Sequence, residues 1–335
     1  MNNVSRSPGP HEVMEDLRRY MGSRVLLTAA ELDLFSQLDQ APGGSGELAD
    51  KLGLEVRALT RVLDCLVTLG YLHKQSGSYQ PTEAGRLLSS EHPRSVLPMA
   101  LHLSHVWEGW SMLSETVRRG ENPEMQPVTE KDEETCRAFI GAMDAIGTDL
   151  AEEIAASLPL PGWKRLLDIG GGSGTYTAAF LRANPELRGV LFDLPKVIPL
   201  AEDKLAQEGL RDRVELVSGD FYLDDLPGGC DAALLSAIIH QNSPQENFEL
   251  FEKAFRALEP GGILIIRDHI MSEDRTRPPA GAMFAINMLV NTPGGDTHTF
   301  SDVQRELSRA GFENAELARS GEHMDCLVTA RRPSE

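Results

Sequence analysis

The stretch Leu166-Leu167-Asp168-Ile169-Gly170-Gly171-Gly172-Ser173-Gly174 says more about the fold than any other segment of the chain. Its apolar start predicts a buried strand, and the glycines let the backbone turn tightly and approach a ligand closely. A helix beginning near Thr175 would direct its free N–H groups at that ligand. The glycines at 170, 172 and 174 follow G-x-G-x-G spacing, whereas the dinucleotide fingerprint needs glycine or alanine at 175. The segment therefore predicts a ligand-binding strand, loop and helix.

Acidic residues follow the next two predicted strands. Asp193 lies 23 residues after the first loop glycine, at the end of Gly189 to Phe192, where its carboxylate can accept hydrogen bonds from both ribose hydroxyls. Asp220 and Phe221 follow Val214 to Val217 and suit the amino group and ring face of an adenine. Each aspartate alone could instead cap a helix or form a turn. The three motifs in this order favour a nucleoside site whose acidic lining suits a cation.

Strand-like and helical runs alternate after residue 161, which is typical of a mostly parallel sheet flanked by helices. The further predicted strands are Arg165 to Asp168, Ala232 to Ile239 and Gly262 to Arg267, and the predicted helices are Thr175 to Asn184, Val197 to Glu208, Glu246 to Leu258 and Ser301 to Ala310. Glu313 to Arg319 and Cys326 to Ala330 suit an antiparallel hairpin that closes the sheet. The predicted fold class is α/β, with a Rossmann-like domain over residues 161–335.

Charge and composition exclude several classes of protein. The 335 residues include 51 Asp and Glu against 32 Lys and Arg, a net charge of −19 that would repel nucleic acid and anionic membranes. The four cysteines, Cys65, Cys136, Cys230 and Cys326, form no CxxC pair, so we expect structural thiols in a reducing compartment. No apolar stretch is long enough to cross a membrane. We therefore expect a cytoplasmic protein without a nucleic-acid or membrane partner.

The first hundred residues predict a helical module with the element order of a winged helix. A helix over Val25 to Leu38 precedes helices at Glu47 to Leu52 and Glu55 to Leu69, and a strand pair follows at Tyr71 to Lys74 and Ser78 to Pro81. DNA binding is disfavoured, because this region has ten Lys and Arg against twelve Asp and Glu. The apolar surplus of the first helix favours dimerisation instead.

Residues 95–160 predict further helices, at Ser95 to Val117 and Glu134 to Ala156, which together cover most of residues 101–160. Bulky side chains such as Trp107 and Trp110 suit either a helical core or the wall of a pocket for a flat organic molecule. We interpret this region as a helical linker that contributes to a substrate pocket, between a dimerisation domain at 1–100 and the α/β domain.

These motifs resemble those of the class I S-adenosylmethionine-dependent O-methyltransferases, the two-domain family of plant caffeate and flavonoid enzymes and bacterial antibiotic and pigment tailoring enzymes. The resemblance extends from Glu31 to Phe35 through the glycine loop to Asn291 to Gly295. It implies a homodimer and S-adenosylmethionine as the methyl donor, with S-adenosylhomocysteine as its product. The cofactor-binding positions that it implies are Asp168, Gly170, Gly172, Gly174, Asp193, Asp220, Phe221 and Ser236.

In this family a strand ends in a histidine, usually followed by Asp-Trp, that acts as general base on the acceptor hydroxyl. Here only the histidine is kept, as His240, and Gln241 and Asn242 follow it. An imidazole can remove a proton from a phenol at neutral pH. A purely structural His240 capping the strand end is the alternative.

The resemblance also implies that two acids orient the histidine. The first aligns with Asp268, which could fix the imidazole tautomer. The second aligns with Thr297, and whether Thr297 or His298 replaces it is left open. By the same alignment Met288, Asn291 and Thr292 are substrate-binding candidates, close in sequence to Met283 and Phe284, although the methionines could also be helix core. No metal-ligand pattern is present.

The sequence thus predicts an S-adenosylmethionine-dependent O-methyltransferase acting on a hydroxyl of an aromatic or polycyclic small molecule, with His240 as general base. C- or N-methylation on a similar scaffold is an alternative, motivated by the changed residues after His240. A donor-binding protein that transfers no methyl group, acting in tailoring or regulation, is a third. The acceptor, the position of methylation and the pathway are not encoded in any motif.

Overall fold

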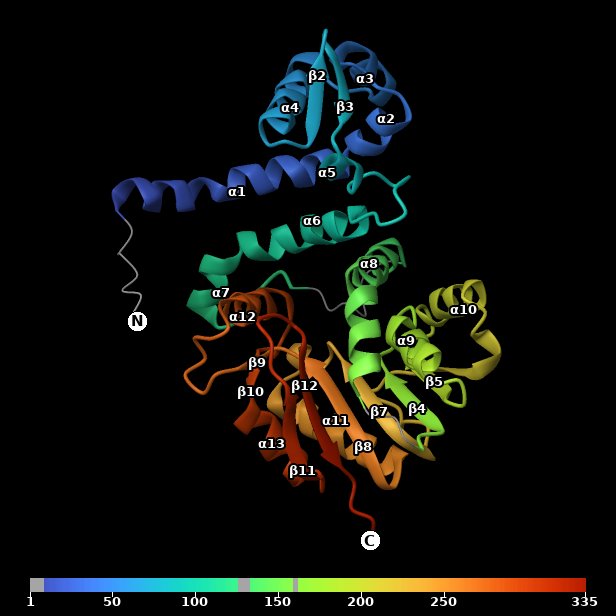
Figure 1. The fold of residues 1–335 in the computed structure, drawn as a ribbon. Helices are drawn as coiled ribbons and strands as arrows, with labels where there is room; N and C mark the ends of the chain where they lie inside the picture. Colours follow the sequence, from blue (N-terminus) through green and yellow to red (C-terminus); the bar gives the residue numbers. More distant parts are fainter. Residues whose placement is uncertain (1–8, 126–132, 159–161) are drawn as a thin grey trace, which may run out of the picture. The chain divides into compact units, whose positions relative to one another are not determined.

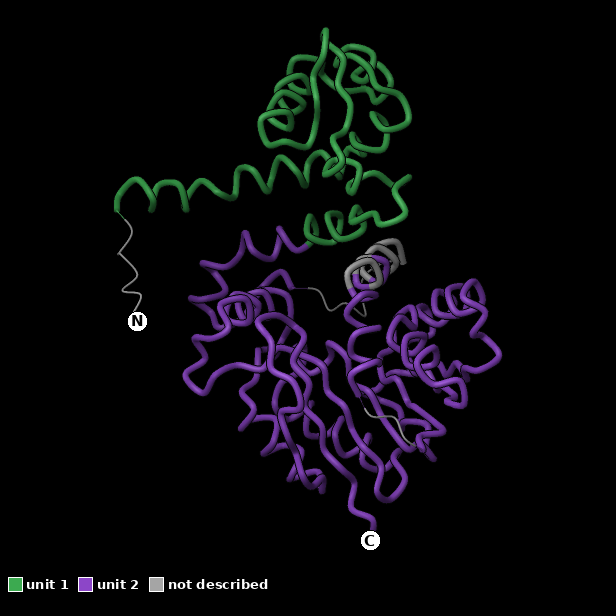
Figure 2. The backbone as a smooth tube through the Cα atoms, in the orientation of Figure 1, with its two compact units in different colours: residues 1–105 green, residues 106–335 purple. Residues whose placement is uncertain are grey.

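The computed structural model describes residues 9–125, 133–158 and 162–335, and it places them in two compact units, residues 1–105 and 106–335 (Figures 1 and 2). Cys65, Cys230 and Cys326 carry free thiols, the last two buried, whereas the side chain of Cys136 lies outside the described residues. Among the described residues, no helix is long and apolar enough to cross a membrane.

Unit 1 consists of helices around a small antiparallel sheet. Its elements are α1 (Pro10–Glu31), α2 (Leu34–Gln40), β1 (Gly43–Gly44), α3 (Ser45–Leu52), α4 (Val56–Thr68), β2 (Leu72–Gln75), β3 (Ser78–Pro81), α5 (Glu83–Arg86) and most of α6 (Leu97–Ser111). The strands pair in the order β1-β3-β2. Ser76 and Gly77 have positive φ values of 50° and 83°, which fits the tight turn between β2 and β3.

The helix predicted at Val25 to Leu38 is wrong in its bounds. The structure has two helices instead, because Asp33 is in the left-handed region (φ 52°) and separates α1 from α2. The start at Pro10 was not predicted, because the first turns of α1 mix charged and apolar residues and are exposed. The apolar side chains of Leu27, Leu34, Phe35 and Leu38 are buried inside unit 1. They are therefore not available to pack against a second subunit.

Unit 2 is built on the seven-stranded sheet that the sequence predicts. Its strands are β4 (Arg165–Ile169), β5 (Arg188–Asp193), β6 (Val214–Ser218), β7 (Cys230–Ser236), β8 (Leu258–Asp268), β11 (Glu313–Arg319) and β12 (Cys326–Arg331). Their order is β11-β12-β8-β7-β4-β5-β6. The five strands from β4 to β8 are parallel, and β12 and β11 add the antiparallel hairpin.

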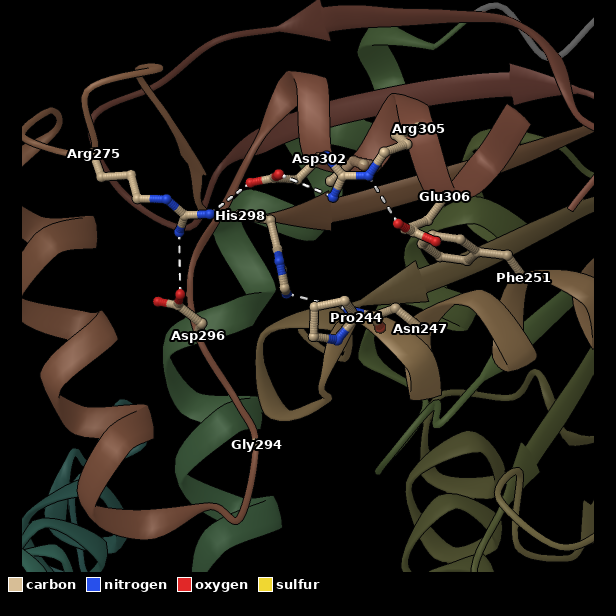
Figure 3. Close-up of a pocket in the computed structure, with 11 residues that line it drawn as sticks. Pro244, Asn247, Phe251, Arg275, Gly294, Asp296, His298, Asp302, Arg305 and Glu306 are labelled. Carbon is tan, nitrogen blue, oxygen red and sulfur yellow. Dashed lines mark hydrogen bonds and ion pairs between the residues drawn. The ribbon is translucent and has the colours of Figure 1, made fainter. Parts of the chain in front are cut away.

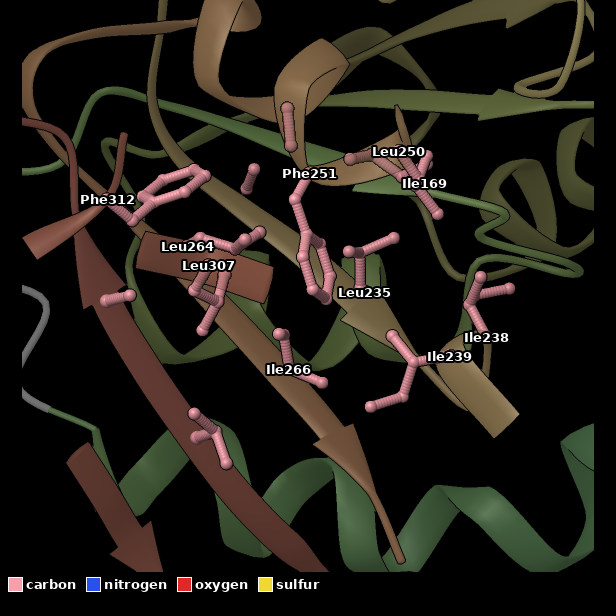
Figure 4. Close-up of a cluster of buried hydrophobic side chains, with 14 of the residues drawn as sticks. Ile169, Leu235, Ile238, Ile239, Leu250, Phe251, Leu264, Ile266, Leu307 and Phe312 are labelled. Carbon is pink, nitrogen blue, oxygen red and sulfur yellow. The ribbon is translucent and has the colours of Figure 1, made fainter. Parts of the chain in front are cut away.

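Helices cover both faces of this sheet. The helices of unit 2 are α7 (Leu113–Arg119), α8 (Glu133–Ser157), α9 (Thr175–Ala183), α10 (Ile198–Gln207), α11 (Pro244–Ala257), α12 (Pro279–Asn291) and α13 (Phe300–Arg309). Leu235 and Ile266 pack under α11 and α13, where Phe251 and Leu307 complete the cluster of Figure 4. Their neighbours Leu234 and Ile265 face α8, α9 and α10. Apolar residues on both sides of each strand explain why the strands read as continuous apolar runs.

Two element boundaries and one short strand pair differ from the prediction in ways that affect the site. The strand predicted to run to Ile239 ends at Ser236, because Ala237 takes a positive φ of 59°, and a 3₁₀ turn, η3 (Ile239–Gln241), follows. The helix predicted at Ser95 to Val117 is divided into α6 and α7 near Met112. The short parallel pair β9 (Ile270–Met271) and β10 (His298–Thr299) has no alternating pattern and was not predicted.

Candidate active site

The glycine loop connects β4 to α9 at the carboxyl edge of the sheet. Gly170, Gly172 and Gly174 all have positive φ values, of 68°, 59° and 84°. A Cβ on Gly170 would lie 2.7 Å from the Ile238 side chain and 3.5 Å from the Phe221 ring. Only glycine meets both the backbone conformation and this close approach without strain. The loop thus presents bare backbone beside Phe221.

Asp193 is the last residue of β5 and faces the glycine loop. Its Oδ2 accepts the Gly172 N–H at 2.7 Å, and its Oδ1 accepts the Leu194 N–H at 2.7 Å. Burial raises the pKa of this carboxyl group. The structure therefore brings Asp193 to the loop, as the sequence predicts, and each carboxylate oxygen keeps one lone pair for a ligand.

Asp168, in contrast, lies behind the loop rather than on its surface. It is buried, and its Oδ2 accepts a hydrogen bond from the Thr177 hydroxyl of α9 at 2.6 Å. Burial raises its pKa to about 6, with Thr177 opposing and Asp193 adding to the shift. In this geometry Asp168 ties β4 to α9 and supports the loop from below.

Asp220 and Phe221 lie on the turn after β6. Asp220 Oδ1 accepts the Tyr222 N–H at 2.9 Å, which is the turn-forming role that the sequence left open. The rings of Phe221 and Tyr222 have centroids 4.6 Å apart. The turn therefore places an aromatic face next to Gly170, while one oxygen of Asp220 is used in holding the turn.

Ser236 is the last residue of β7, and its hydroxyl accepts Arg267 Nε–H at 2.8 Å. The Arg267 guanidinium also donates to the Met324 carbonyl at 2.7 Å and lies 5.0 Å from the centre of the Tyr176 ring. Ser236 is thus on the correct strand end for the site, but in this structure its oxygen is engaged by a buried arginine that the sequence did not single out.

His240 and Asp268 form a buried hydrogen-bonded pair. His240 Nδ1 lies 2.9 Å from Asp268 Oδ1 and 3.0 Å from Oδ2, and the side chains are 10% and 1% exposed. Burial would raise the pKa of Asp268, but the positive charge of His240 and the hydrogen bonds from His240 and the His269 backbone outweigh it and lower the pKa. In the neutral imidazole, Nδ1 carries the proton because the ionised carboxylate only accepts, and Nε2 then keeps a lone pair.

An aromatic contact and a second histidine complete this side of the site. The Phe284 ring of α12 meets the His240 ring edge to face, with centroids 4.9 Å apart. His269 packs on the same phenylalanine at 4.9 Å, and burial lowers its pKa. The sequence pointed to Phe284 only as a neighbour of Met288. No sequence pattern pointed to His269, which was only the residue that follows Asp268.

The substrate candidates Met288, Asn291 and Thr292 lie at the end of α12. Met288 is buried. Asn291 donates to the Asn287 carbonyl at 2.9 Å, and the Thr292 hydroxyl donates to the Met288 carbonyl at 2.8 Å. Thr292 Oγ1 also accepts the Gly295 N–H at 2.9 Å, and a Cβ on Gly295 would lie 2.5 Å from the His240 carbonyl oxygen. The end of α12 is therefore brought against the backbone of His240.

Thr297 and His298 do not contact the His240 ring through any hydrogen bond that the structure contains among its described residues. Thr297 is buried, and its carbonyl accepts a hydrogen bond from Arg275 at 2.7 Å. His298 Nε2 lies 3.0 Å from the Ile239 carbonyl oxygen, on the backbone before His240. His298 lines a small cavity of about 140 Å³. Figure 3 shows it there together with Asn247, Arg275 and Asp302. The second acid is thus replaced by neither side chain.

Among the side chains that the structure describes, no group of three His, Cys, Asp or Glu residues could hold a metal ion. A histidine hydrogen-bonded to a buried carboxylate, at the same sheet edge as a glycine loop and a strand-end aspartate, is an arrangement that can support acid–base chemistry.

Comparison with known proteins places this geometry in a family. Residues 110–313 match the model of the O-methyltransferase domain, and residues 14–91 match that of the O-methyltransferase dimerisation domain. Tetracenomycin polyketide synthesis 8-O-methyl transferase TcmO of Streptomyces glaucescens is 32% identical, over 97% of both chains. The 3-hydroxy-5-methyl-1-naphthoate 3-O-methyltransferase of Streptomyces sahachiroi is 30% identical, over 92% of this chain and 91% of the relative.

Solved structures agree in fold. The mitomycin 7-O-methyltransferase MmcR has a TM-score of 0.84 at 27% identity, over 96% of this chain and 97% of the other. PigF with SAH has a TM-score of 0.89 at 23% identity, over 97% and 100%. This chain belongs to the two-domain, S-adenosylmethionine-dependent O-methyltransferases of the bacterial antibiotic and pigment tailoring type.

Proposed function

We propose that this O-methyltransferase methylates a phenolic hydroxyl of an aromatic or polycyclic small molecule, with His240 as the general base. The observation that carries the proposal is the buried pair of His240 Nδ1 and Asp268, 2.9 Å apart, beside the Phe284 ring. Relatives named for a polyketide and for a naphthoate support the acceptor class.

The residues around the loop fit S-adenosylmethionine. A Cβ at Gly170 or Gly171 would meet a side chain at 2.7 Å, so the loop is kept bare, and Asp193 stands at its rim with free lone pairs. In our proposal Gly170, Gly172 and Gly174 cradle the donor, Asp193 takes its ribose hydroxyls, and Phe221 covers the adenine, with Asp220 and Ser236 nearby. When bound, the donor supplies a methyl group on a positively charged sulfur. Asp168 contributes by holding the loop.

His240 would take the acceptor's proton on Nε2. The hydrogen bond from Nδ1 to Asp268 fixes the tautomer that leaves Nε2 free, and the lowered pKa of Asp268 keeps the carboxylate charged, which stabilises the imidazolium that forms. Low exposure of both side chains excludes water and strengthens that interaction. General-base catalysis of this type contributes about a hundredfold to ten-thousandfold to the rate.

The acceptor would lie along α12. Phe284 contacts His240 directly, and Met288 follows one helical turn later on the same side. Aromatic and thioether side chains suit a flat aromatic acceptor. We place Asn291 and Thr292 at the end of the acceptor-lining side of α12, where their hydrogen bonds direct the following segment toward His240.

We also propose that residues 1–100 form the dimerisation domain of a homodimer, with residues 101–160 as a helical linker and 161–335 as the catalytic domain. The exposed apolar side chains of α1 follow helical spacing: Val13, Met14, Leu17, Tyr20 and Met21, which are 42–62% exposed. Such a stripe is typical of a helix that packs against another subunit. This stripe, rather than the residues after Val25, is the apolar surplus that supports a dimer.

Transfer to nitrogen is the second candidate. The N,N-dimethyltransferase OxyT of Streptomyces rimosus is 28% identical over 94% of both chains, so one family scaffold is found with both acceptor atoms. A neutral amine would still need to lose a proton after methylation, and His240 could take it.

The test incubates the purified protein with methyl-labelled S-adenosylmethionine and each of two probes, 3-hydroxy-1-naphthoate and its 3-amino counterpart. We expect label in the hydroxyl probe, in a product that O-demethylation reverses. Label in the amine alone would favour the second candidate. No label in either probe, while calorimetry shows the donor bound, would contradict the proposed acceptor class.

A further inference from the structure

The peptide group before His240 is held at both ends. Its N–H, which belongs to His240, points at Asp268 Oδ2 at 3.4 Å. Its carbonyl oxygen, which belongs to Ile239, lies 2.8 Å from Asn247 Nδ2 and 3.0 Å from His298 Nε2. The N–H of Asn242 reaches the same oxygen at 3.4 Å, a longer contact than either side chain makes.

Asn247 and His298 come from separate elements and converge on this carbonyl, with Asn247 Nδ2 3.2 Å from His298 Nε2. Asn247 is on α11 and His298 is on β10, the strand that pairs with β9 directly after Asp268. A carbonyl oxygen only accepts, so a lone pair of His298 Nε2 at 3.0 Å would repel it. Nε2 therefore carries a proton and donates, and the Ile239 oxygen receives two side-chain donors.

A buried chain of hydrogen bonds fixes the orientation of Asn247. Asn242 Nδ2 donates to Asn247 Oδ1 at 3.0 Å, and the Tyr222 hydroxyl donates to Asn242 Oδ1 at 2.5 Å. Asn242, Asn247 and His298 are 0%, 3% and 6% exposed. Each amide is thereby left with only one consistent orientation, in which Asn247 points its NH₂ group at Ile239. Three buried polar side chains and the more exposed Tyr222 are linked by these hydrogen bonds, which makes the arrangement rigid.

We propose that Asn247 and His298 are positioning residues for methyl transfer: together they lock the Ile239–His240 peptide group, so that the His240 ring keeps Nδ1 on Asp268 and Nε2 toward the acceptor. The inference rests on the proposed role of His240 as base. It differs from the roles of Thr297 and His298 that the sequence left open, because His298 acts on the backbone of the catalytic turn and not on the imidazole.

The same chain of hydrogen bonds also connects the η3 turn to the loop after β6. Tyr222 follows Phe221, the residue that we assign to the adenine, and its ring packs on Phe221 at 4.6 Å. Removing the Tyr222 hydroxyl would free Asn242 and, through it, Asn247. Tyr222→Phe is therefore the mildest perturbation of this hydrogen-bond chain, because it acts at the end that is farthest along the chain from His240.

The test compares His298→Phe and Asn247→Leu, which keep side-chain size but remove the donor to Ile239, with His298→Gln, whose amide can still donate. Arg305→Gln is the matched control, since Arg305 lines the same cavity and its ion pairs within the described part of the chain are to Asp302 and Glu306. We expect kcat for the labelled probe to fall about tenfold to a hundredfold in the first two variants, because a small misplacement of a catalytic group costs that much. KM and donor affinity should stay within about twofold, and His298→Gln and Arg305→Gln should keep most of kcat.

A second readout needs no acceptor. In protein labelled with ¹⁵N at the histidine rings, the His240 signals are assigned by their loss in His240→Gln. Wild-type protein should show a protonated Nδ1 and an unprotonated Nε2, and His298→Phe and Asn247→Leu should move both shifts toward a mixture of tautomers. Unchanged shifts together with unchanged kcat would overturn the positioning role. Full activity of His240→Ala would instead overturn the base itself, so the two failures are distinguishable.

Discussion

At the scale of single residues, the chemistry depends on how two carboxylates differ. Asp268 and Asp168 are both fully buried at strand ends, yet the pKa of Asp268 is lowered and that of Asp168 is raised to about 6. Asp268 has a histidine that can carry positive charge as its partner, whereas Asp168 has only the hydroxyl of Thr177. A partner that can be charged thus decides which buried acid stays ionised.

Asp268→Asn tests the orienting role of this carboxylate. The amide can donate to Nδ1 and so favour the tautomer with its proton on Nε2, where it blocks proton removal. We expect kcat to fall about a hundredfold to ten-thousandfold, with donor affinity unchanged by calorimetry. Asp296→Asn is the control, since that carboxylate is half exposed and pairs with Arg275. Equal losses in both variants would contradict the role of Asp268.

Asp168 predicts a pH dependence of stability. Its pKa is raised in the folded protein, so between about pH 4 and pH 6 the folded state binds a proton that the unfolded state has released. This contribution to the free energy of unfolding is present at low pH and is lost as pH rises through 6. Urea unfolding at pH 5 and pH 7 should show that Asp168→Asn gains about 1 kcal/mol relative to wild type over this interval. A constant difference would contradict the raised pKa.

At the scale of elements, the sequence predicted the parallel strands and both helical layers because each strand is apolar on both faces and each loop has glycine or aspartate at its end. The prediction failed where the backbone conformation of a single residue determined where an element ends. Ala237 turns the chain after β7 with a positive φ that no sequence pattern signals, so His240 lies on η3 and not on the strand. The sequence also could not predict that His298 and Asn247 contact the turn before His240. His298 is brought there by the pairing of β10 with β9, which no sequence pattern indicates.

The site itself was predicted in part for the same reason. Residues at strand ends, such as Asp193, Asp268 and Gly170, are brought together by sheet topology, which the sequence encodes. The direction of each side chain is a matter of packing, and so the burial of Asp168 against Thr177 could not be anticipated.

The glycine loop gives a prediction at this scale. In Gly170→Ala the added methyl group would strain a φ of 68° and approach Ile238 at 2.7 Å. We expect a loss of about 1–2 kcal/mol from the backbone alone and a donor affinity at least tenfold weaker, measured by urea unfolding and calorimetry. Gly46→Ala, which lies in α3 and meets nothing within 4 Å, should leave donor affinity unchanged and should not destabilise the fold. Donor binding at wild-type strength in Gly170→Ala would show that the loop does not form the cradle.

At the scale of the whole molecule, the exposed stripe on α1 leads to an expectation about assembly. Placing a charge in it, as in Leu17→Glu, would bury an unpaired carboxylate in a subunit interface. Analytical ultracentrifugation should show the wild type with the mass of two chains and the variant shifted toward one. Val56→Glu, at another exposed apolar residue of the same unit, is the control. An unchanged dimer in Leu17→Glu would move the interface elsewhere.

The most direct test of the central claim, that His240 removes the acceptor's proton during methyl transfer, is a comparison of wild type and His240→Ala with methyl-labelled S-adenosylmethionine and 3-hydroxy-1-naphthoate, with donor binding measured in parallel. We predict label in the probe with wild type, at least a hundredfold less with His240→Ala, and equal donor affinity in the two proteins. Methyl transfer at the wild-type rate by His240→Ala would contradict the account.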